Sequence, residues 1–472
     1  MTILRYIFIA LEVVLLFNLL IAVHELGHFL AAKWRGLKIE RFAIWFGPAI
    51  WKRNIGGIEY SLNSIPFGGY VALPQMATME VIEGKNDTAA EALPNVSPLD
   101  KIIVAFAGPL FSFLLAVFFA FIVWGVGKPG NEVGASTVIG WEGENGPAWK
   151  AGLRPGDEIL EVDGHPVKYF ISAGADSIKW RIITSEGTNI AIKYLRDGQE
   201  AMAYPIPYHR ATKWYERRAL REITILPAMK SIIYQVASNS PAALAGLTNG
   251  DEVVALNHEK IYHPETILSL EDSWSNSPVK PVTLTVKRGD GQFDCTLLAV
   301  KPVVPTNSHP SLGILAVGEE TNASLAYPNP VDQIQTSVGQ IFATIGALFA
   351  HKGEIGVQQL GGPVMIARVY YNLFQDEDGW RRVLWFSVIL NVNLALINLL
   401  PMPVLDGGHI TLSLIEAVRR RPVKTHILNY IQNSFMVLLL LFMVYIMFFD
   451  TGDWWRSAHS EREQTVIFAP AK

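Results

Sequence analysis

Cysteine is nearly absent from this chain, and charged residues are sparse. The 472 residues include one cysteine, Cys295, which excludes an internal disulfide and any cysteine-rich metal site. Charged residues make up 17% of the chain and the formal net charge is -4, so neither a nucleic-acid-binding footprint nor an acidic tail is indicated. We expect no nucleic acid among the partners of this protein.

Half of the residues are hydrophobic, and four segments each approach the about 20 apolar residues that span a bilayer. The first is too long for a cleaved signal peptide, so we expect it to remain in the mature protein. Basic residues concentrate after the first and third segments, which places those two loops in the cytoplasm by the positive-inside rule. Both termini and the stretch of about 128–380 then lie on the opposite side. The segments are 6–32, 102–126, 383–400 and 431–449, and the loop cations are Lys33, Arg35, Lys38, Arg41, Lys52, Arg53, Lys85, Arg419, Arg420, Arg421 and Lys424.

The motif His-Glu-Leu-Gly-His lies inside the first apolar segment, at residues 24–28. In a helix, His24 and His28 are one turn apart and can share a metal ion, and Glu25 is close enough to activate a water. Such motifs also arise by chance without a metal. A charged group at membrane depth costs at least about 2.5 kcal/mol, which favours a functional site here.

A catalytic zinc ion usually takes three protein ligands and one water, so two histidines leave it one ligand short. The best candidate for the third is Asp406, which follows the third apolar segment in the run Asn-Leu-Leu-Pro-Met-Pro-Val-Leu-Asp-Gly-Gly. The two prolines are expected to end the helix, and the two glycines to permit a sharp turn. The carboxylate is then presented at the cytoplasmic end of a span, at the depth of His24 and His28.

A repeat lies in the hydrophilic middle of the chain. The pattern Pro-Ala-x-x-Ala-Gly-Leu-x-x-Gly-Asp-Glu begins at Pro147 and again 94 residues later at Pro241, a spacing that indicates two domains and not a solenoid. Each copy predicts a short helix ended by glycine and then a strand, at 158–162 and 252–256. Three histidines of this region are expected on surface loops: His165, His258 and His263.

The two copies resemble PDZ domains of bacterial membrane and periplasmic proteases. PDZ domains bind an extended peptide as an added strand. The alternative is that they bind no peptide and act as a steric screen over the membrane site.

Together these features resemble the site-2 protease family of intramembrane metalloproteases, of the bacterial regulator-of-sigma-E protease type, over essentially the whole chain. The resemblance implies a polytopic α-helical membrane protein of the bacterial inner membrane, with four transmembrane helices, a membrane-associated β-sheet and two inserted PDZ domains. It implies Zn²⁺ held by His24, His28 and Asp406, with Glu25 as general base and acid. It also implies substrates that are pre-trimmed single-pass membrane proteins, chiefly anti-sigma factors in envelope-stress signalling.

Further residues take roles from the same resemblance. The pattern of residues 42–73 predicts short strands with turns at Gly47-Pro48 and Gly56-Gly57. In the family, this region forms a sheet that dips into the membrane and pairs with the substrate. The alternative is a cytoplasmic hairpin. Asn393 and Asn398 are implied to contact the substrate backbone, although polar residues in a span more often bond other helices. Ser112 stands where the family leads us to expect Asn, which leaves its role open.

Three other functions remain as alternatives: a catalytically silent scaffold that binds peptides through its PDZ domains, a transporter with an intramembrane proton or metal path, and a protease that degrades remnant signal peptides. The intact Glu25 argues against the scaffold, and no inverted repeat supports the transporter.

The sequence predicts the following order of segments. The N-terminal part has a first transmembrane helix at 1–34, a cytoplasmic loop at 35–100 and a second helix at 101–127. The middle has PDZ domains at 128–222 and 223–305 and a linker with an amphipathic helix (331–349) at 306–380. The C-terminal part has a third helix at 381–402, a cytoplasmic segment at 403–430, a fourth helix at 431–450 and a periplasmic tail at 451–472.

Overall fold

The computed structural model describes residues 2–76, 96–130, 132–172, 174–305, 309–318, 324–350, 353–375, 378–420, 425–460 and 466–469. The chain divides into two compact units, one formed by Met1–Pro129, Leu325–Ile341 and Leu360–Gly452, the other by Gly130–Ser324, Phe342–Gln359 and Asp453–Lys472. Three of the loop cations, Lys85, Arg421 and Lys424, lie outside the described residues.

The first unit contains the four apolar segments, and each is a helix. The helices are α1 (Thr2–Trp34), α3 (Pro98–Val126), α11 (Gly379–Asn398) and α13 (Thr425–Ser460). Within them, Ile7–Trp34, Pro98–Val126, Gly379–Asn398 and Leu428–Ser457 are long and apolar enough to cross a membrane. Large apolar side chains such as Leu15, Phe118 and Leu441 are more than half exposed, as expected for surfaces that face lipid. Within the described residues, the four predicted segments are thus helices that can span a membrane, and this is a membrane protein.

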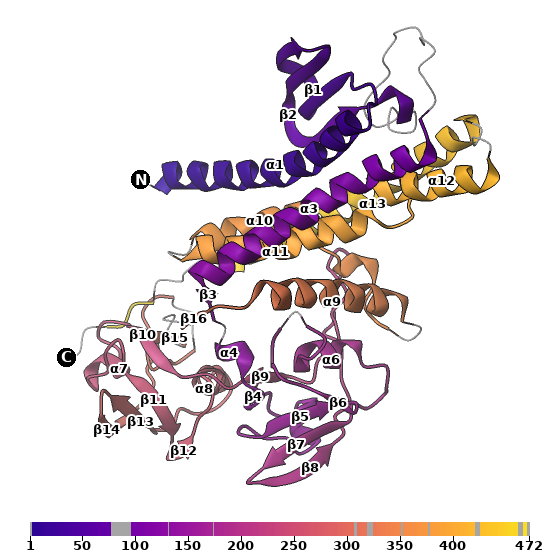
Figure 1. Cartoon of the computed structure of the whole chain (residues 1–472). Coiled ribbons are helices and arrows are strands. Elements are labelled where there is room, and N and C mark those ends of the chain that lie inside the picture. The colour runs from indigo at the N-terminus through magenta and orange to yellow at the C-terminus, as the bar shows by residue number, and fades with distance from the viewer. Residues whose placement is uncertain are drawn as a thin grey trace. The chain divides into compact units, whose positions relative to one another are not determined.

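Helix α3 is the centre of the first unit and packs against α1, α11 and α12 (Asp406–Arg419) (Figure 1). Two ion pairs join its first turn to neighbouring segments, Arg35 to Asp100 at 2.5 Å and Lys101 to Glu416 at 3.0 Å. The first unit also contains η1 (Pro74–Met76) and the start of α9 (Pro330–Phe349). Strand β3 (Lys128–Pro129) pairs with β16 (Leu325–Ala326), and α10 (Pro363–Gln375) packs on α1 and α11.

The sheet of the first unit differs from the expected series of short strands. It consists of two strands of 15 residues, β1 (Arg41–Ile55) and β2 (Ile58–Ala72), joined by the predicted turn at Gly56-Gly57. No turn separates strands at Gly47-Pro48; instead β1 bends there, with Trp45 and Gly47 at positive φ. Both strands fold over, so that residues 41–44 pair with 59–62 on one side and with 69–72 on the other. Local turn signals could not reveal this doubled pairing, because it depends on contacts between distant residues.

The second unit contains two modules whose helices and strands follow one another in the same order. The first has β4 (Ile139–Glu142), α5 (Pro147–Lys150), β5 (Glu158–Val162), β6 (His165–Pro166), α6 (Ile178–Thr184), β7 (Ile192–Arg196), β8 (Gln199–Ala203) and β9 (Ile225–Pro227). The second has β10 (Ile232–Val236), α7 (Pro241–Leu244), β11 (Glu252–Leu256), β12 (Glu259–Lys260), α8 (Glu265–Ser273), β13 (Val282–Arg288), β14 (Gly291–Leu297) and β15 (Ile314–Gly318). Outside the modules lie α4 (Glu132–Ala135) and η2 (Val357–Gln359).

The repeated Gly-Asp pair has the same structural role in both modules. Arg196 donates two hydrogen bonds to Asp157, at 2.6 and 2.7 Å, and Arg288 donates two to Asp251, at 2.7 and 2.8 Å. Both aspartates are 1% exposed. A buried carboxylate needs such a partner, since an unpaired one is strongly destabilising. The conserved spacing within the repeat therefore reflects one buried ion pair per module.

The modules extend beyond the boundaries predicted for them. The last strand of each returns to pair with its first, β9 with β4 and β15 with β10, so the first module runs past residue 222 and the second past residue 305.

One of the three histidines expected on surface loops is buried. His263 is 9% exposed, and burial lowers its pKa to about 4. His165 and His258 are exposed as expected.

Candidate metal centre

Three side chains that are distant in sequence meet in the first unit. His24 Nε2 lies 3.2 Å from Asp406 Oδ2, His28 Nε2 lies 3.3 Å from Asp406 Oδ1, and the two Nε2 atoms are 3.3 Å apart. All three residues are buried. Zinc bonds of about 2.0–2.1 Å at tetrahedral angles place neighbouring ligand atoms about 3.3–3.4 Å apart. Each residue offers one ligand atom, and the spacing of the two nitrogens from each other and from the Asp406 carboxylate therefore fits one zinc ion. The nitrogen and carboxylate oxygen donors are of the kind that zinc takes.

Hydrogen bonds on the far side of each imidazole orient the two histidines. His28 Nδ1 donates to the carbonyl of Val104 at 2.8 Å, and His24 Nδ1 lies 3.0 Å from Ser112 Oγ. Because a carbonyl only accepts, His28 carries a proton on Nδ1, and Nε2 is the nitrogen that can bind a metal ion. Both partners belong to α3. The role of Ser112, left open by the sequence, is thus contact with His24.

Glycines let the helices of the centre approach closely. A Cβ atom added to Gly27 of α1 would lie 2.3 Å from the carbonyl oxygen of Ala107 in α3. One added to Gly108 would lie 2.2 Å from His28 Nε2 and 2.9 Å from His24 Nε2. Sequence reasoning did not single out Gly108 as a site residue. The signal available was its place in residues 107–113, the stretch around Ser112 that resembles the family.

Asp406 is the first residue of α12, which begins after the predicted break in the chain. Helix α11 ends at Asn398, before Pro401, as expected. The two glycines after Asp406 do not form a sharp turn; they lie in the first turn of α12. A Cβ atom added to Gly407 would lie 2.3 Å from the carbonyl oxygen of Leu399, and one added to Gly408 would lie 2.1 Å from that of Met402. The glycines are therefore required for close packing of α12 against the incoming chain, and this contact positions Asp406.

Glu25 lies on α1 beside the second strand of the sheet. A Cβ atom added to Gly69 of β2 would lie 3.3 Å from Glu25 Cγ and 3.1 Å from the carbonyl oxygen of Ala43. Because Gly69 has no side chain, the backbone of β2 approaches both Glu25 and the neighbouring strand. The sheet and the three-residue cluster are thus brought together by consecutive residues of α1.

The three asparagines of α11 differ in their position relative to the cluster. Asn398 Nδ2 lies 3.5 Å from His24 Nε2. Asn391 is fully buried and donates to the carbonyl of Ser387 at 2.8 Å, a contact within its own helix. Asn393 is partly buried, and within the described part of the chain no hydrogen bond joins it to the cluster. His409, one turn after Asp406 in α12, is also buried.

Comparisons with known proteins cover nearly the whole chain. The family model described as Peptidase family M50 matches residues 12–442. The chain is 28% identical over 454 residues to the regulator of sigma E protease of Haemophilus influenzae, across 91% of this chain and 96% of that one. It is 27% identical over 453 residues to the regulator of sigma-E protease of Escherichia coli (92% and 96%), and 30% identical over 439 residues to a Vibrio cholerae protein with a zinc metalloprotease name (86% and 90%).

Proposed function

The chain belongs to peptidase family M50 and is a zinc metallopeptidase, and from that premise we propose that it hydrolyses transmembrane segments of other proteins within the bilayer. The observation that carries the proposal is the cluster of His24, His28 and Asp406. The two histidines belong to a helix long and apolar enough to span a membrane, and Asp406 begins α12, shortly after another such helix ends. A hydrolytic centre at that depth acts on peptide bonds that lie in the membrane.

His24, His28 and Asp406 hold the zinc ion in this proposal, and Ser112 and the Val104 carbonyl fix the two imidazoles. Bound zinc supplies a Lewis acid that polarises the scissile carbonyl and activates a water near neutral pH. Asp406 supplies a negative charge that offsets the charge of the metal. Bound zinc would then have three protein ligands, the number usual for a catalytic site.

Glu25 moves the proton in this reaction. Its carboxylate accepts a proton from the attacking water as the new C–O bond forms, and it returns that proton to the amide nitrogen as the C–N bond breaks. Glu25 follows His24 directly on α1, so its side chain leaves the helix beside the cluster. Gly69 of β2 has no side chain that would occupy the space next to Glu25.

The sheet presents the substrate as an extended chain. A transmembrane helix that unwinds loses its own hydrogen bonds and needs replacements in a dry setting. The segment 69–72 of β2 adjoins Glu25 at Gly69, so a substrate strand added there lies beside the proton-transferring group. Asn398 and Asn393 contact the substrate backbone in this arrangement, and of the two it is Asn398 that lies at the cluster.

The two modules of the second unit act as PDZ domains on the periplasmic side of the membrane in this proposal. They either hold an extended peptide or exclude proteins whose outer domain is still large. Substrates are single-pass membrane proteins that another protease has already trimmed, of the anti-sigma-factor type. The relatives from Haemophilus influenzae and Escherichia coli are named as regulators of sigma E, which supports a role in sigma-factor regulation. The segment between the first and second spans, which carries Lys52, and the segment between the third and fourth, which carries Arg419, face the cytoplasm of a bacterial cell in this topology. Remnant signal peptides form a second substrate class, because the same residues would cleave them.

Substitution of the carboxylate ligand tests the proposed centre. Asp406→Asn should lower zinc affinity by more than about 100-fold, the upper range for losing a residue that only hydrogen-bonds a metal ligand. Cleavage of a detergent-solubilised transmembrane substrate should fall with it. Asp450→Asn is the matched control, because Asp450 is also buried but accepts hydrogen bonds from the N–H groups of Gly362 and Met365. Full zinc occupancy and full cleavage in Asp406→Asn would refute the ligand assignment.

A further inference from the structure

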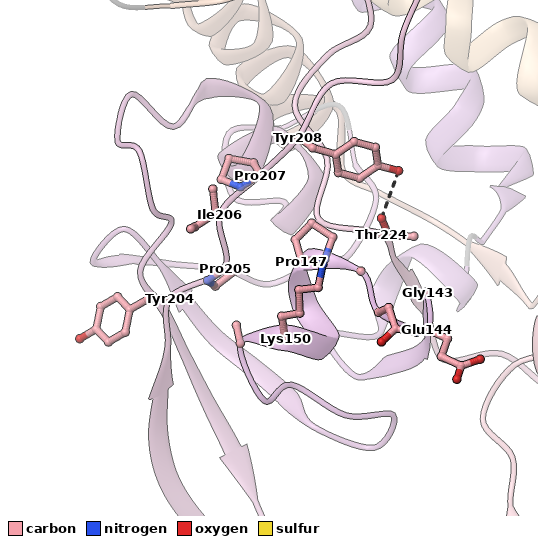
Figure 2. Close-up of a pocket in the computed structure, with 13 residues that line it drawn as sticks. Gly143, Glu144, Pro147, Lys150, Tyr204, Pro205, Ile206, Pro207, Tyr208 and Thr224 are labelled. Atoms are coloured by element: carbon pink, nitrogen blue, oxygen red, sulfur yellow. Dashed lines mark hydrogen bonds between the residues drawn. The ribbon is translucent and has the colours of Figure 1, made fainter.

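The first module contains an open pocket of about 660 Å³ that none of the residues proposed above uses. It is lined by the loop before α5, by α5 itself, by the segment that follows β8 and by Thr224 (Figure 2). No residue of α6 contributes, so the pocket is separate from the helix-flanked sheet edge at which PDZ domains take a peptide. Its apolar wall consists of Pro147, Pro205, Ile206 and Pro207.

The internal repeat identifies the equivalent place in the second module. In the first module, Gly143 donates to the carbonyl of Thr224 at 3.0 Å; in the second, Ala237 donates to the carbonyl of Gly313 at 2.9 Å. Thr224 and Gly313 both have positive φ, at 58° and 83°. Because Gly143 and Ala237 are 94 residues apart, the repeat offset, Thr224 corresponds to Gly313.

That equivalent place is filled by residues from elsewhere in the chain. Phe468 is 3% exposed, and a Cβ atom added to Gly313 would lie 3.2 Å from its ring. The residue before it, Ile467, is extended: its N–H donates to the carbonyl of Val304 at 2.9 Å, and its carbonyl accepts from Val303 at 2.7 Å. The second module thus shows what this position of the fold binds, namely an extended segment with a buried aromatic side chain.

We propose that the pocket of the first module binds an extended segment of another protein, with an aromatic side chain inserted against Pro147 and the segment 204–208. The pocket is rich in proline and tyrosine, which supply flat apolar surface to an aromatic ring. Thr224 donates a hydrogen bond to the hydroxyl of Tyr208 at 3.3 Å, so this pocket has a polar rim where the second module has a glycine. Figure 2 shows Lys150 and Glu144 beside it, two charges that select residues next to the aromatic one.

The occupant is a different protein and not a second copy of this chain. The Ile467–Phe468 segment is already bound on the second module, where Phe468 is buried, so it is not free to enter a pocket on another copy. A different protein with an exposed extended segment meets no such competition.

A labelled peptide with the sequence of residues 464–472 is the probe, titrated against the full-length protein in detergent and followed by fluorescence anisotropy. We expect saturable binding that weakens at least tenfold when the peptide phenylalanine becomes alanine, and equally when the protein carries Ile206→Asp or Tyr204→Ala. Ile206 is 63% exposed and Tyr204 56% exposed, so neither change removes a buried side chain. Ile171→Asp is the matched control in the same module, because Ile171 is 42% exposed and does not line the pocket; affinity there should stay within twofold.

Replacement of the peptide phenylalanine by benzoylphenylalanine and crosslinking identifies the contacted module. Crosslinks to residues 143–151 or 204–208 support the proposal. It is overturned by the absence of saturable binding, by undiminished affinity in Ile206→Asp, or by crosslinks confined to the second module. A dimer in sedimentation that Ile206→Asp dissociates would assign the pocket to another copy of this chain and would also overturn it.

Discussion

The two imidazoles of the centre are oriented by different kinds of partner. Val104 offers His28 a backbone carbonyl, which no side-chain substitution removes. Ser112 offers His24 a hydroxyl, which is fully buried and can donate or accept. Outer partners of this kind fix the tautomer and ring orientation of a metal-bound histidine. Ser112 is therefore the residue through which the centre can be perturbed without touching a ligand.

Ser112→Ala should weaken zinc binding by about 10–100-fold, because His24 loses the partner of its Nδ1 atom. Competition with a fluorescent zinc chelator measures the change. Ser387→Ala is the matched control: Ser387 is also a fully buried serine in a spanning helix, but it bonds Tyr370 at 2.9 Å and lies outside the cluster. Equal zinc affinity in Ser112→Ala and the parent would show that the Ser112 contact has no role in metal binding.

At the scale of elements, the centre exists because α1 and α3 approach each other at glycines. The contact of Gly27 with Ala107 brings the two backbones together, and Gly108 leaves the space that the imidazoles occupy. Small residues permit this kind of approach between membrane helices. The same glycines therefore serve helix packing and the geometry of the metal centre.

Gly108→Ala should abolish stoichiometric zinc binding and lower cleavage by about 100-fold or more, because the added methyl group would displace both imidazoles. The zinc content of purified protein and the cleavage rate are the two readouts. Gly125→Ala, in the same helix, is the control, since a Cβ atom at Gly125 meets nothing within 4 Å among the described residues and should change neither readout. A Gly108→Ala protein with normal zinc content would contradict the packing described for α1 and α3.

Sequence reasoning succeeded where the signal was local and failed where it depended on distant contacts. Long apolar runs predict the four helices, and the spacing of His24 and His28 places them on one helix face. The motif around Asp406 indicated the third group of the cluster. The doubled pairing of β1 with β2 and the return of β9 and β15 to their modules are set by strand partners far apart in sequence, so no local pattern shows them. The packing role of Gly407 was mistaken for a turn for the same reason.

At the scale of the whole chain, the second unit is largely an insertion into the first. Its longest segment lies between β3 and β16, which pair through Pro129 with Leu325 and Lys128 with Ala326. The N–H of Gly130 also donates to the carbonyl of Ser324 at 3.0 Å. The two ends of the insertion are therefore adjacent, and a short linker can replace everything between them.

Replacement of residues 131–323 by a short Gly-Ser linker should leave zinc binding intact and allow cleavage of substrates that still carry a large outer domain. The expectation follows from the proposed role of the modules as a screen that admits only trimmed proteins. Cleavage of matched trimmed and untrimmed substrates by the shortened and full-length proteins is the measurement. If the shortened protein binds zinc, cleaves the trimmed substrate and still rejects the untrimmed one, the modules are not the screen.

The most direct test of the account is the cleavage rate and zinc content of Glu25→Gln, measured on the same preparation with a detergent-solubilised transmembrane substrate. Glutamine keeps the size of the side chain but cannot accept the proton of the attacking water. We expect a full complement of zinc and a rate lower by about 100–10,000-fold, the contribution typical of a general acid–base group. Cleavage by Glu25→Gln at the parental rate would contradict this expectation.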